Sequence, residues 1–414
     1  MACLNKALWV LLSGVLIVPI TFGILGFLLP SFGYFPILDK HQFNLDYFYV
    51  SSNVPGISKS IILSFFTGFL STVLALFFSQ LIILSIFQSR VFSFIKTIIS
   101  PLLALPHVTM AIGLLFIFSP SGLLLRIFSP WLTGFERPPN IFIIPDDYGF
   151  FLILGLVLKE IPFFILVSIS AIEQFGARKF FNLGKSLQHT TFSVWCVLLF
   201  PLIYHRIRLI VFIVIAFAAS VVDMSLLLAP STPSTLAIQI LQNYQSSEPK
   251  SLFIASNLAL IQLLVILKLF LIWFLLEKLL SNKYLFTFLV NAVSYKSNLI
   301  KYFTFTLILI LSILSFLTII SSFLWGLGGN WYFPNLLPKN ISFEVLTIFF
   351  NENKSLILIS VFVPLIVSIL SCLIVTLWVE LTESLNKRNQ FLEGLIFLPL
   401  LIPQISFLIG MQSF

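Results

Sequence analysis

The chain has 414 residues, of which 59% are hydrophobic and 9% charged, and its mean hydropathy is +1.09. A soluble domain needs a much larger polar surface, so this composition excludes a soluble globular protein and predicts an all-α polytopic membrane protein. The net charge of +8 does not require a nucleic-acid partner, because Lys and Arg on the cytoplasmic side of membrane helices account for it.

Apolar runs of about 20 residues are long enough to cross a bilayer as helices. The first run follows Lys6 and lacks a small-residue cleavage site, so we predict a retained membrane anchor rather than a signal peptide. Nine spans are expected, at residues 8–29, 60–87, 97–118, 149–172, 209–229, 252–276, 302–325, 355–379 and 394–414.

The distribution of basic residues predicts a cytoplasmic N-terminus. With that orientation, fourteen Lys and Arg residues fall in cytoplasmic segments and seven in outer segments. Membrane proteins place an excess of Lys and Arg on the cytoplasmic side, so the bias favours this orientation over the reverse.

A weak internal repeat links the two ends of the sequence. The stretch KSIILSFF recurs as KSLILISV, and SPLLALPHVTMAIGLLF is followed in the same order by its counterpart LPLLIPQISFLIGMQ. Matched prolines and the matched Gly113 and Gly410 favour duplication over chance similarity of apolar sequence, and duplication is common in transporters.

The repeat predicts three parts of the chain. Residues 1–280 form a first six-helix repeat, 281–301 a cytoplasmic linker, and 302–414 a second repeat. The second copy stops inside its last expected span, so we expect the C-terminal half of that repeat to be missing from this sequence.

The cytoplasmic segment 173–208 contains Gly184-Lys185-Ser186, which has the form of the end of a phosphate-binding P-loop. A full P-loop needs another glycine five positions earlier and a preceding strand, but that position is Lys179 and the segment follows a membrane span. We therefore predict that the chain does not itself bind ATP. The segment is expected to form a short helix outside the membrane, a turn near Pro201 and the start of the next span; an ordinary interfacial loop is the alternative.

This segment resembles the cytoplasmic EAA loop of ABC importer permeases, the inner-membrane components of binding-protein-dependent transport systems. The ending LLFP matches the family pattern, whereas the Glu-Ala-Ala is absent and Gly184 lies four residues too early. The stretches IRLIVFIVIAFAASVVDMSLLLAPSTPSTLAIQIL and ISPLLALPHVTMAIGLLF are similar to fused two-repeat permeases related to iron and thiamine importers. Either Gln188 takes the place of the family's glycine or the loop has an insertion. The residues expected to couple to the ATPase are Gly184, Ser186, Leu187, Gln188, Phe200 and Pro201.

The resemblance implies a non-enzymatic permease of the bacterial inner membrane that imports a small solute. Its loop would form a coupling helix that docks on a separate cytoplasmic ABC ATPase, itself a dimer. An external solute-binding protein and membrane lipid are the other expected partners, without nucleic acid, cofactor or metal. Iron, thiamine, polyamine and oxyanion importers share this architecture, so the solute is not assigned.

Ionisable residues inside spans are costly and are therefore candidates for function. Lys159 and Glu160 are either pathway or gate residues or members of an interhelical salt bridge, and Asp223 either contacts a solute or makes a packing hydrogen bond. Lys159 and Asp223 are also possible partners of each other. Lys268 is expected to snorkel or pair.

Polar residues that follow a proline in both repeat copies, His107 and Gln404, predict a kinked, partly open helix or, alternatively, a solute contact. Two further hypotheses compete with the ABC permease. The first is an ion-coupled secondary transporter that uses Lys159, Glu160 and Asp223 as a charge relay. The second is a defective permease fragment.

Overall fold

The computed structural model describes residues 2–89, 91–141, 143–281, 297–385 and 390–412, and most of the described chain is helical. The predicted all-α polytopic membrane fold is confirmed: within these described ranges, eight helices are long and apolar enough to cross a membrane. They are residues Asn5–Ser31, Ile57–Ile86, His107–Phe128, Phe150–Gln174, Thr191–Ser220, Pro249–Leu280, Tyr302–Leu327 and Lys354–Ser384. The predicted linker 281–301 lies largely outside the described residues.

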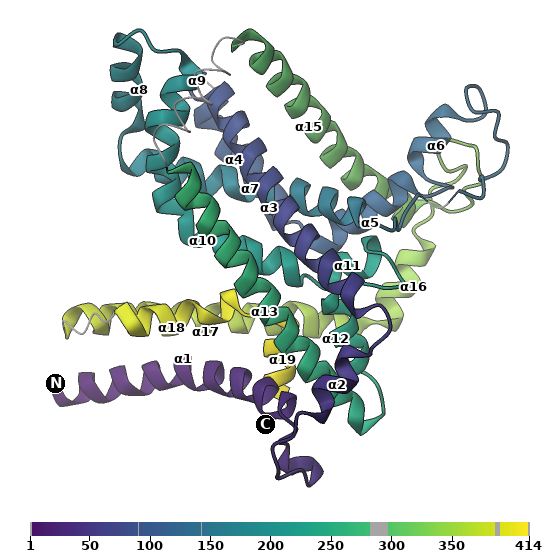
Figure 1. Cartoon of the computed structure of the whole chain (residues 1–414). Helices are drawn as coiled ribbons and strands as arrows, with labels where there is room; N and C mark the ends of the chain where they lie inside the picture. Colours follow the sequence, from purple (N-terminus) through teal and green to yellow (C-terminus); the bar gives the residue numbers. More distant parts are fainter. Residues whose placement is uncertain (1, 90, 142, 282–296, 386–389, 413–414) are drawn as a thin grey trace.

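Long helices alternate with short ones at their ends (Figure 1). In the first part of the chain they are α1 (Ala2–Ser31), η1 (Pro36–Leu38), α2 (Asp46–Ser52), α3 (Ile57–Ile86), α4 (Val91–Ala104), α5 (His107–Phe118), α6 (Leu123–Phe128), α7 (Phe150–Gln174), α8 (Ala177–Ser186), α9 (Thr191–Val194), the π-helix η2 (Trp195–Leu199), α10 (Phe200–Ser220), α11 (Asp223–Leu228), α12 (Leu236–Tyr244) and α13 (Pro249–Leu280). The remaining helices are α15 (Ser297–Leu327), α16 (Glu344–Glu352), α17 (Lys354–Ser384), α18 (Gln390–Leu401) and α19 (Gln404–Gln412).

Two predicted spans are broken near a proline. The third expected span is divided into α4 and α5 just before His107, and the ninth is divided into α18 and α19 just before Gln404. Pro106 and Pro403 lack a backbone N–H and therefore interrupt the helical hydrogen bonds at these points. The predicted opening of the helix is thus confirmed at both prolines, whereas the continuous third and ninth spans are wrong.

The fifth predicted span, at 209–229, is wrong at both ends. The membrane helix begins at Thr191 and continues through η2 and Pro201 to Ser220, where the chain turns before α11. Pro201 lies inside this membrane helix just after the π-helical stretch η2, where the regular hydrogen-bond pattern that a proline disturbs is already altered. The turn outside the membrane lies at residues 187–190 instead.

The core of the described chain lies among α3, α7, α10, α12 and α13. In Figure 1, α1, α17 and α18 extend side by side to one side of this bundle. α17 is almost entirely exposed, which suits a helix whose side chains face lipid. Reciprocal hydrogen bonds tie α1 to α17: Trp9 Nε1 donates to Thr382 Oγ1 over 3.0 Å, and Trp378 Nε1 donates to Ser13 Oγ over 3.0 Å.

The first helix of each predicted repeat packs against the broken helix of the other predicted repeat. Gly113 of α5 contacts Thr318 and Ser321 of α15, and Gly410 of α19 contacts Gly23 and Gly26 of α1. Gly410 lies 297 positions after Gly113, and Thr318 and Ser321 lie 295 positions after Gly23 and Gly26. The same close contact therefore occurs at matched positions, and small residues at each site allow the backbones to approach.

The close contact of α1 with α19 leads to a prediction. A β-carbon at Gly26 would lie 2.1 Å from the carbonyl oxygen of Gly410, whereas one at Gly14 of the same helix would meet nothing within 4 Å. We expect Gly26→Val to lower the unfolding temperature of the detergent-purified chain, because overpacking costs about 1–3 kcal/mol. Gly14→Val should leave that temperature unchanged, and an equal loss in both variants would contradict the packing described.

Candidate functional site

The predicted coupling segment is a helix, a turn and the start of the next membrane helix. Phe181 and Gly184 form the buried face of α8, and Phe181 packs against Phe87 with ring centroids 5.3 Å apart. A β-carbon at Gly184 would lie 2.8 Å from the side chain of Val194, so only glycine allows α8 to approach α9 this closely. These contacts fix α8 to the end of α3 and to the beginning of the next membrane helix.

The turn between α8 and α9 has its own stabilising bonds. Gln188 has a φ of 62°, a left-handed conformation that reverses the chain direction. The Thr190 side chain caps α9 by accepting the backbone N–H of Ser193 over 3.2 Å. Lys185 Nζ donates to Thr191 Oγ1 over 3.3 Å across the turn. The turn is therefore a defined feature of the backbone.

A second apolar face of α8 is exposed. Phe180, Leu183 and Leu187 lie at helical spacing and are 41%, 58% and 62% exposed. We name these three residues the α8 stripe. The basic side chains of Arg178 and Lys179 lie on the same helix and are exposed. An apolar stripe flanked by positive charge fits a docking surface for a partner or a lipid interface.

The structure separates the six predicted coupling residues into two groups. Gly184, Ser186, Leu187 and Gln188 lie together at the end of α8 and in its turn, where all but Gly184 are exposed. Phe200 and Pro201 lie on α10, in the following membrane helix. Gly184-Lys185-Ser186 occupies the last turn of α8, and this negative end of a helix is not the end that binds phosphate.

Lys159 of α7 is 5% exposed and caps the broken helix. Its Nζ donates to the carbonyl oxygens of Leu102, Leu103 and Leu105 at the end of α4, over 3.2 Å and 3.0 Å for the first two. The last carbonyls of a helix have no partner within it, and a positive charge there is favourable. All three donors of the ammonium group are therefore directed at backbone oxygens freed by the break.

Glu160 faces the other side of the same break. Its carboxylate lies 3.8 Å from Nε2 of His107, the first residue of α5, and its side chain is 7% exposed. A negative charge near a helix N-terminus is stabilised by the helix dipole. The His107 ring also lies beside Phe217 of α10, with centroids 4.9 Å apart. Lys159 thus contacts the end of α4, and Glu160 lies at the start of α5. Neighbouring residues point about 100° apart around a helix, which allows these two side chains to reach different helix ends.

Asp223 follows a second helix break, which lies beside the first. α10 ends at Ser220, and α11, which starts at Asp223, packs on α5 and α7. Asp223 Oδ1 accepts the backbone N–H of Met224 over 2.9 Å. The buried Gln262 of α13 donates to the carbonyl oxygen of Ala219 over 3.2 Å at this break. The described contacts of Lys159 and Asp223 do not join these two residues to each other.

Sequence reasoning missed two polar clusters. Arg126 of α6 is buried, and its guanidinium donates to the carbonyl oxygens of Ser121 over 2.7 Å and Asn335 over 2.7 Å. It also lies 4.5 Å from the ring centroid of Trp331, so it joins α6 to the loop that follows α15. The second cluster joins α10 to α13 and is described below.

Among the described residues, no group of three or more His, Cys, Asp or Glu side chains is placed to hold a metal ion.

Comparison with known proteins agrees with the helical architecture. No family model matches the chain. A curated protein, the inner membrane ABC transporter permease protein YnjC of Escherichia coli (strain K12), is 26% identical over 184 residues, which is 44% of this chain. This chain is similar to an ABC transporter permease. The resemblance predicted from the sequence is thus confirmed. The matched region spans about a third of the relative's own length (34%).

Proposed function

We propose that the chain is the membrane-spanning permease of an ABC importer in the inner membrane, and that α8 and its turn dock on a separate cytoplasmic ATPase. The observation that supports this most strongly is the α8 stripe, which presents three large apolar side chains on a helix fixed by its opposite face. The similarity to YnjC supports a permease and therefore an ATPase partner. An external solute-binding protein is proposed on the same basis, as are the dimeric state of the ATPase and the cytoplasmic N-terminus.

The two helix breaks are the proposed solute route. Discontinuous helices supply solute sites in transporters because their ends present unpaired backbone groups within the membrane. Glu160 and Asp223 lie at these breaks and are the candidates for contact with the solute. Lys159 has its three donors directed at carbonyl oxygens, so we assign it to holding the break rather than to the solute.

The hydrogen bonds of Lys159 also help to distinguish an ABC permease from an ion-coupled secondary transporter. A charge relay through Lys159, Glu160 and Asp223 would require these side chains to contact one another, whereas the Lys159 ammonium contacts backbone carbonyl groups and Asp223 contacts the backbone of its own helix. The arrangement therefore favours the ATP-driven permease.

Capture of the tagged chain from native membranes in a mild detergent tests the proposal. We expect it to elute from a sizing column in constant ratio with a protein that carries complete Walker A and Walker B motifs. Added ATP should be hydrolysed by that complex. Elution without such a protein, from membranes in which one is present and soluble in the same detergent, would contradict the proposal.

A further inference from the structure

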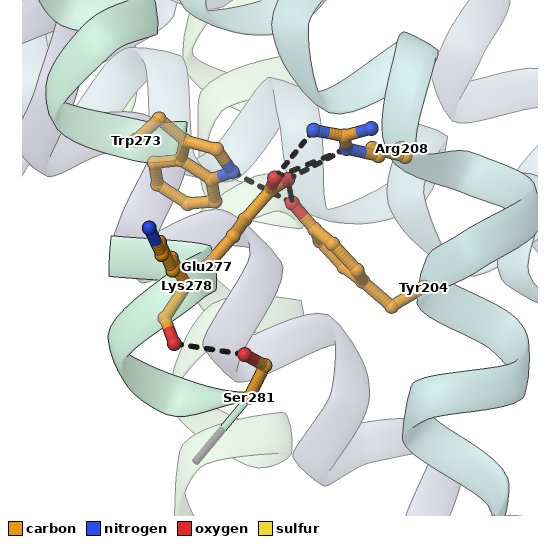
Figure 2. Close-up of polar contacts among 6 residues, drawn as sticks. All are labelled: Tyr204, Arg208, Trp273, Glu277, Lys278 and Ser281. Atoms are coloured by element: carbon orange, nitrogen blue, oxygen red, sulfur yellow. Dashed lines mark hydrogen bonds and ion pairs between the residues drawn. The ribbon is translucent and has the colours of Figure 1, made fainter. Parts of the chain in front are cut away.

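Four side chains interlock α10 and α13 just after the docking segment (Figure 2). Tyr204 and Arg208 lie four residues apart on α10, and Trp273 and Glu277 lie four residues apart on α13. Residues at this spacing lie on one face of a helix, so each helix presents a matched pair to the other. We call these four residues the α10–α13 interlock.

The Glu277 carboxylate is the centre of the interlock. Arg208 donates to it through Nε, at 3.1 Å and 3.0 Å from the two oxygens, and through Nη2 at 2.7 Å. The Tyr204 hydroxyl also donates to Glu277, and it accepts the indole N–H of Trp273 over 2.7 Å. Figure 2 shows all four side chains converging on this point. A forked Arg–carboxylate pair with a second donor fixes orientation as well as distance.

A second bond joins the same two helices near the break at Asp223. Gln262 of α13 donates to the Ala219 carbonyl oxygen of α10. Ala219 also touches Gly68 of α3, at which a β-carbon would lie 2.7 Å from the Ala219 Cα. From Arg208 to Ala219 is about 16 Å along a helix, so α10 and α13 are joined at two well-separated points. Two such points prevent one helix from sliding or rotating independently of the other.

The interlock lies close to the proposed docking segment. The helix that contains Tyr204 starts at Thr191, directly after the exposed turn of α8, and continues through the π-helical stretch η2. Tyr204 is about 20 Å of helix beyond that start. Any displacement of α8 and its turn therefore reaches the interlock through one continuous helix.

We infer that the α10–α13 interlock is a positioning device that makes α13 follow α10 when α8 is displaced, so that the movement reaches the helix break at Asp223. This inference rests on the proposed function, because it requires a partner that moves α8. Its physical basis is a rigid unit with two attachment points, rather than mere proximity between two sites. A purely structural role for the four residues would predict a change in stability without a change in this coupled movement.

Spin labels on the full chain in complex with its captured ATPase test the inference. One label pair reports on α8, at Asn182→Cys and Tyr302→Cys, and the other reports on α13, at Lys278→Cys and Tyr302→Cys; all three positions are exposed. Cys3, Cys196 and Cys372 are replaced by Ser for this purpose. Distances are measured with and without ATP and Mg²⁺.

We expect both distances to shift on addition of ATP in the otherwise native chain. Glu277→Gln should at least halve the shift at position 278 and retain it at position 182, because the bond from Gln262 to Ala219 remains. The exchanged pair Arg208→Glu with Glu277→Arg should restore the shift at 278. Trp9→Phe, which removes a hydrogen bond between α1 and α17, is the control for general weakening and should keep both shifts.

The outcomes separate this inference from the proposed function. A shift at position 278 of undiminished size in a folded Glu277→Gln chain, while position 182 also shifts, would overturn the interlock and leave the proposed function standing. No shift at position 182 in the otherwise native complex would overturn the docking of α8, and the inference with it. Loss of both shifts in Trp9→Phe would show that any weakening of the bundle has the same effect, and would also overturn the interlock.

Discussion

Lys159→Met is expected to destabilise the chain by about 3 kcal/mol, because three backbone carbonyl groups at the end of α4 would lose their donor. An unsatisfied buried polar group costs about 1–3 kcal/mol, and methionine preserves most of the side-chain volume. We expect the unfolding temperature in detergent, followed by tryptophan fluorescence, to fall by about 5 °C or more. The effect would be large for a single substitution, since most cost about 1 kcal/mol.

Lys268→Met is the matched control for Lys159→Met. It makes the same chemical change in another membrane helix, α13, where Lys268 is exposed. Removing an exposed charge from an apolar helix should leave the unfolding temperature unchanged or raise it slightly. If Lys268→Met were as harmful as Lys159→Met, the loss would reflect membrane insertion rather than capping of the helix break.

Leu183→Asp should reduce capture of the ATPase by the tagged chain at least tenfold, without loss of the folded permease. Leu183 is the central residue of the α8 stripe and is 58% exposed, so a charge there costs the folded chain little but disrupts an apolar contact with a partner. The measurement is the ratio of ATPase to permease in the captured complex, with the unfolding temperature of the permease recorded in parallel.

Asn182→Asp is the control on the same helix. It adds the same charge at an exposed position next to Leu183 but outside the α8 stripe. We expect ATPase capture to stay within about twofold of the unsubstituted chain, since an exposed charge outside the contact contributes little. Equal losses in the two variants would mean that charge on α8 matters and that the stripe does not.

The sequence predicts the features that depend on local chemistry. Hydropathy locates most of the membrane helices but not the bounds of the fifth and ninth expected spans, and the missing N–H of Pro106 and Pro403 accounts for the two helix breaks. The same reasoning fails at Pro201, because the membrane helix continues past this proline from the π-helical stretch that lies just before it. The π-helical stretch has no comparable sequence signal. The sequence therefore predicts a turn near Pro201, whereas the structure has the turn at residues 187–190.

The candidate site depends on contacts between residues distant in sequence. Lys159 caps carbonyl groups more than fifty positions earlier, and Gln262 caps Ala219 more than forty positions earlier. The break before Asp223 contains no proline, and its carbonyl groups are satisfied by the tertiary contact from Gln262 to Ala219 and by the local bond from the Ser225 hydroxyl to Val221. The sequence identifies Lys159 and Glu160 as ionisable residues that are costly to place within a membrane. It does not predict that they lie at opposite ends of one broken helix.

Photo-crosslinking from position 183 is the most direct test of the claim that α8 docks on a separate ATPase. A photoreactive amino acid at position 183 in the full chain, activated in native membranes, should give a covalent adduct with the protein that contains the Walker motifs. The same amino acid at Tyr148, which is 87% exposed in the loop before α7, should not. Crosslinks from position 183 to lipid alone, with the ATPase present, would show that the α8 stripe lies in the membrane interface and would contradict the docking.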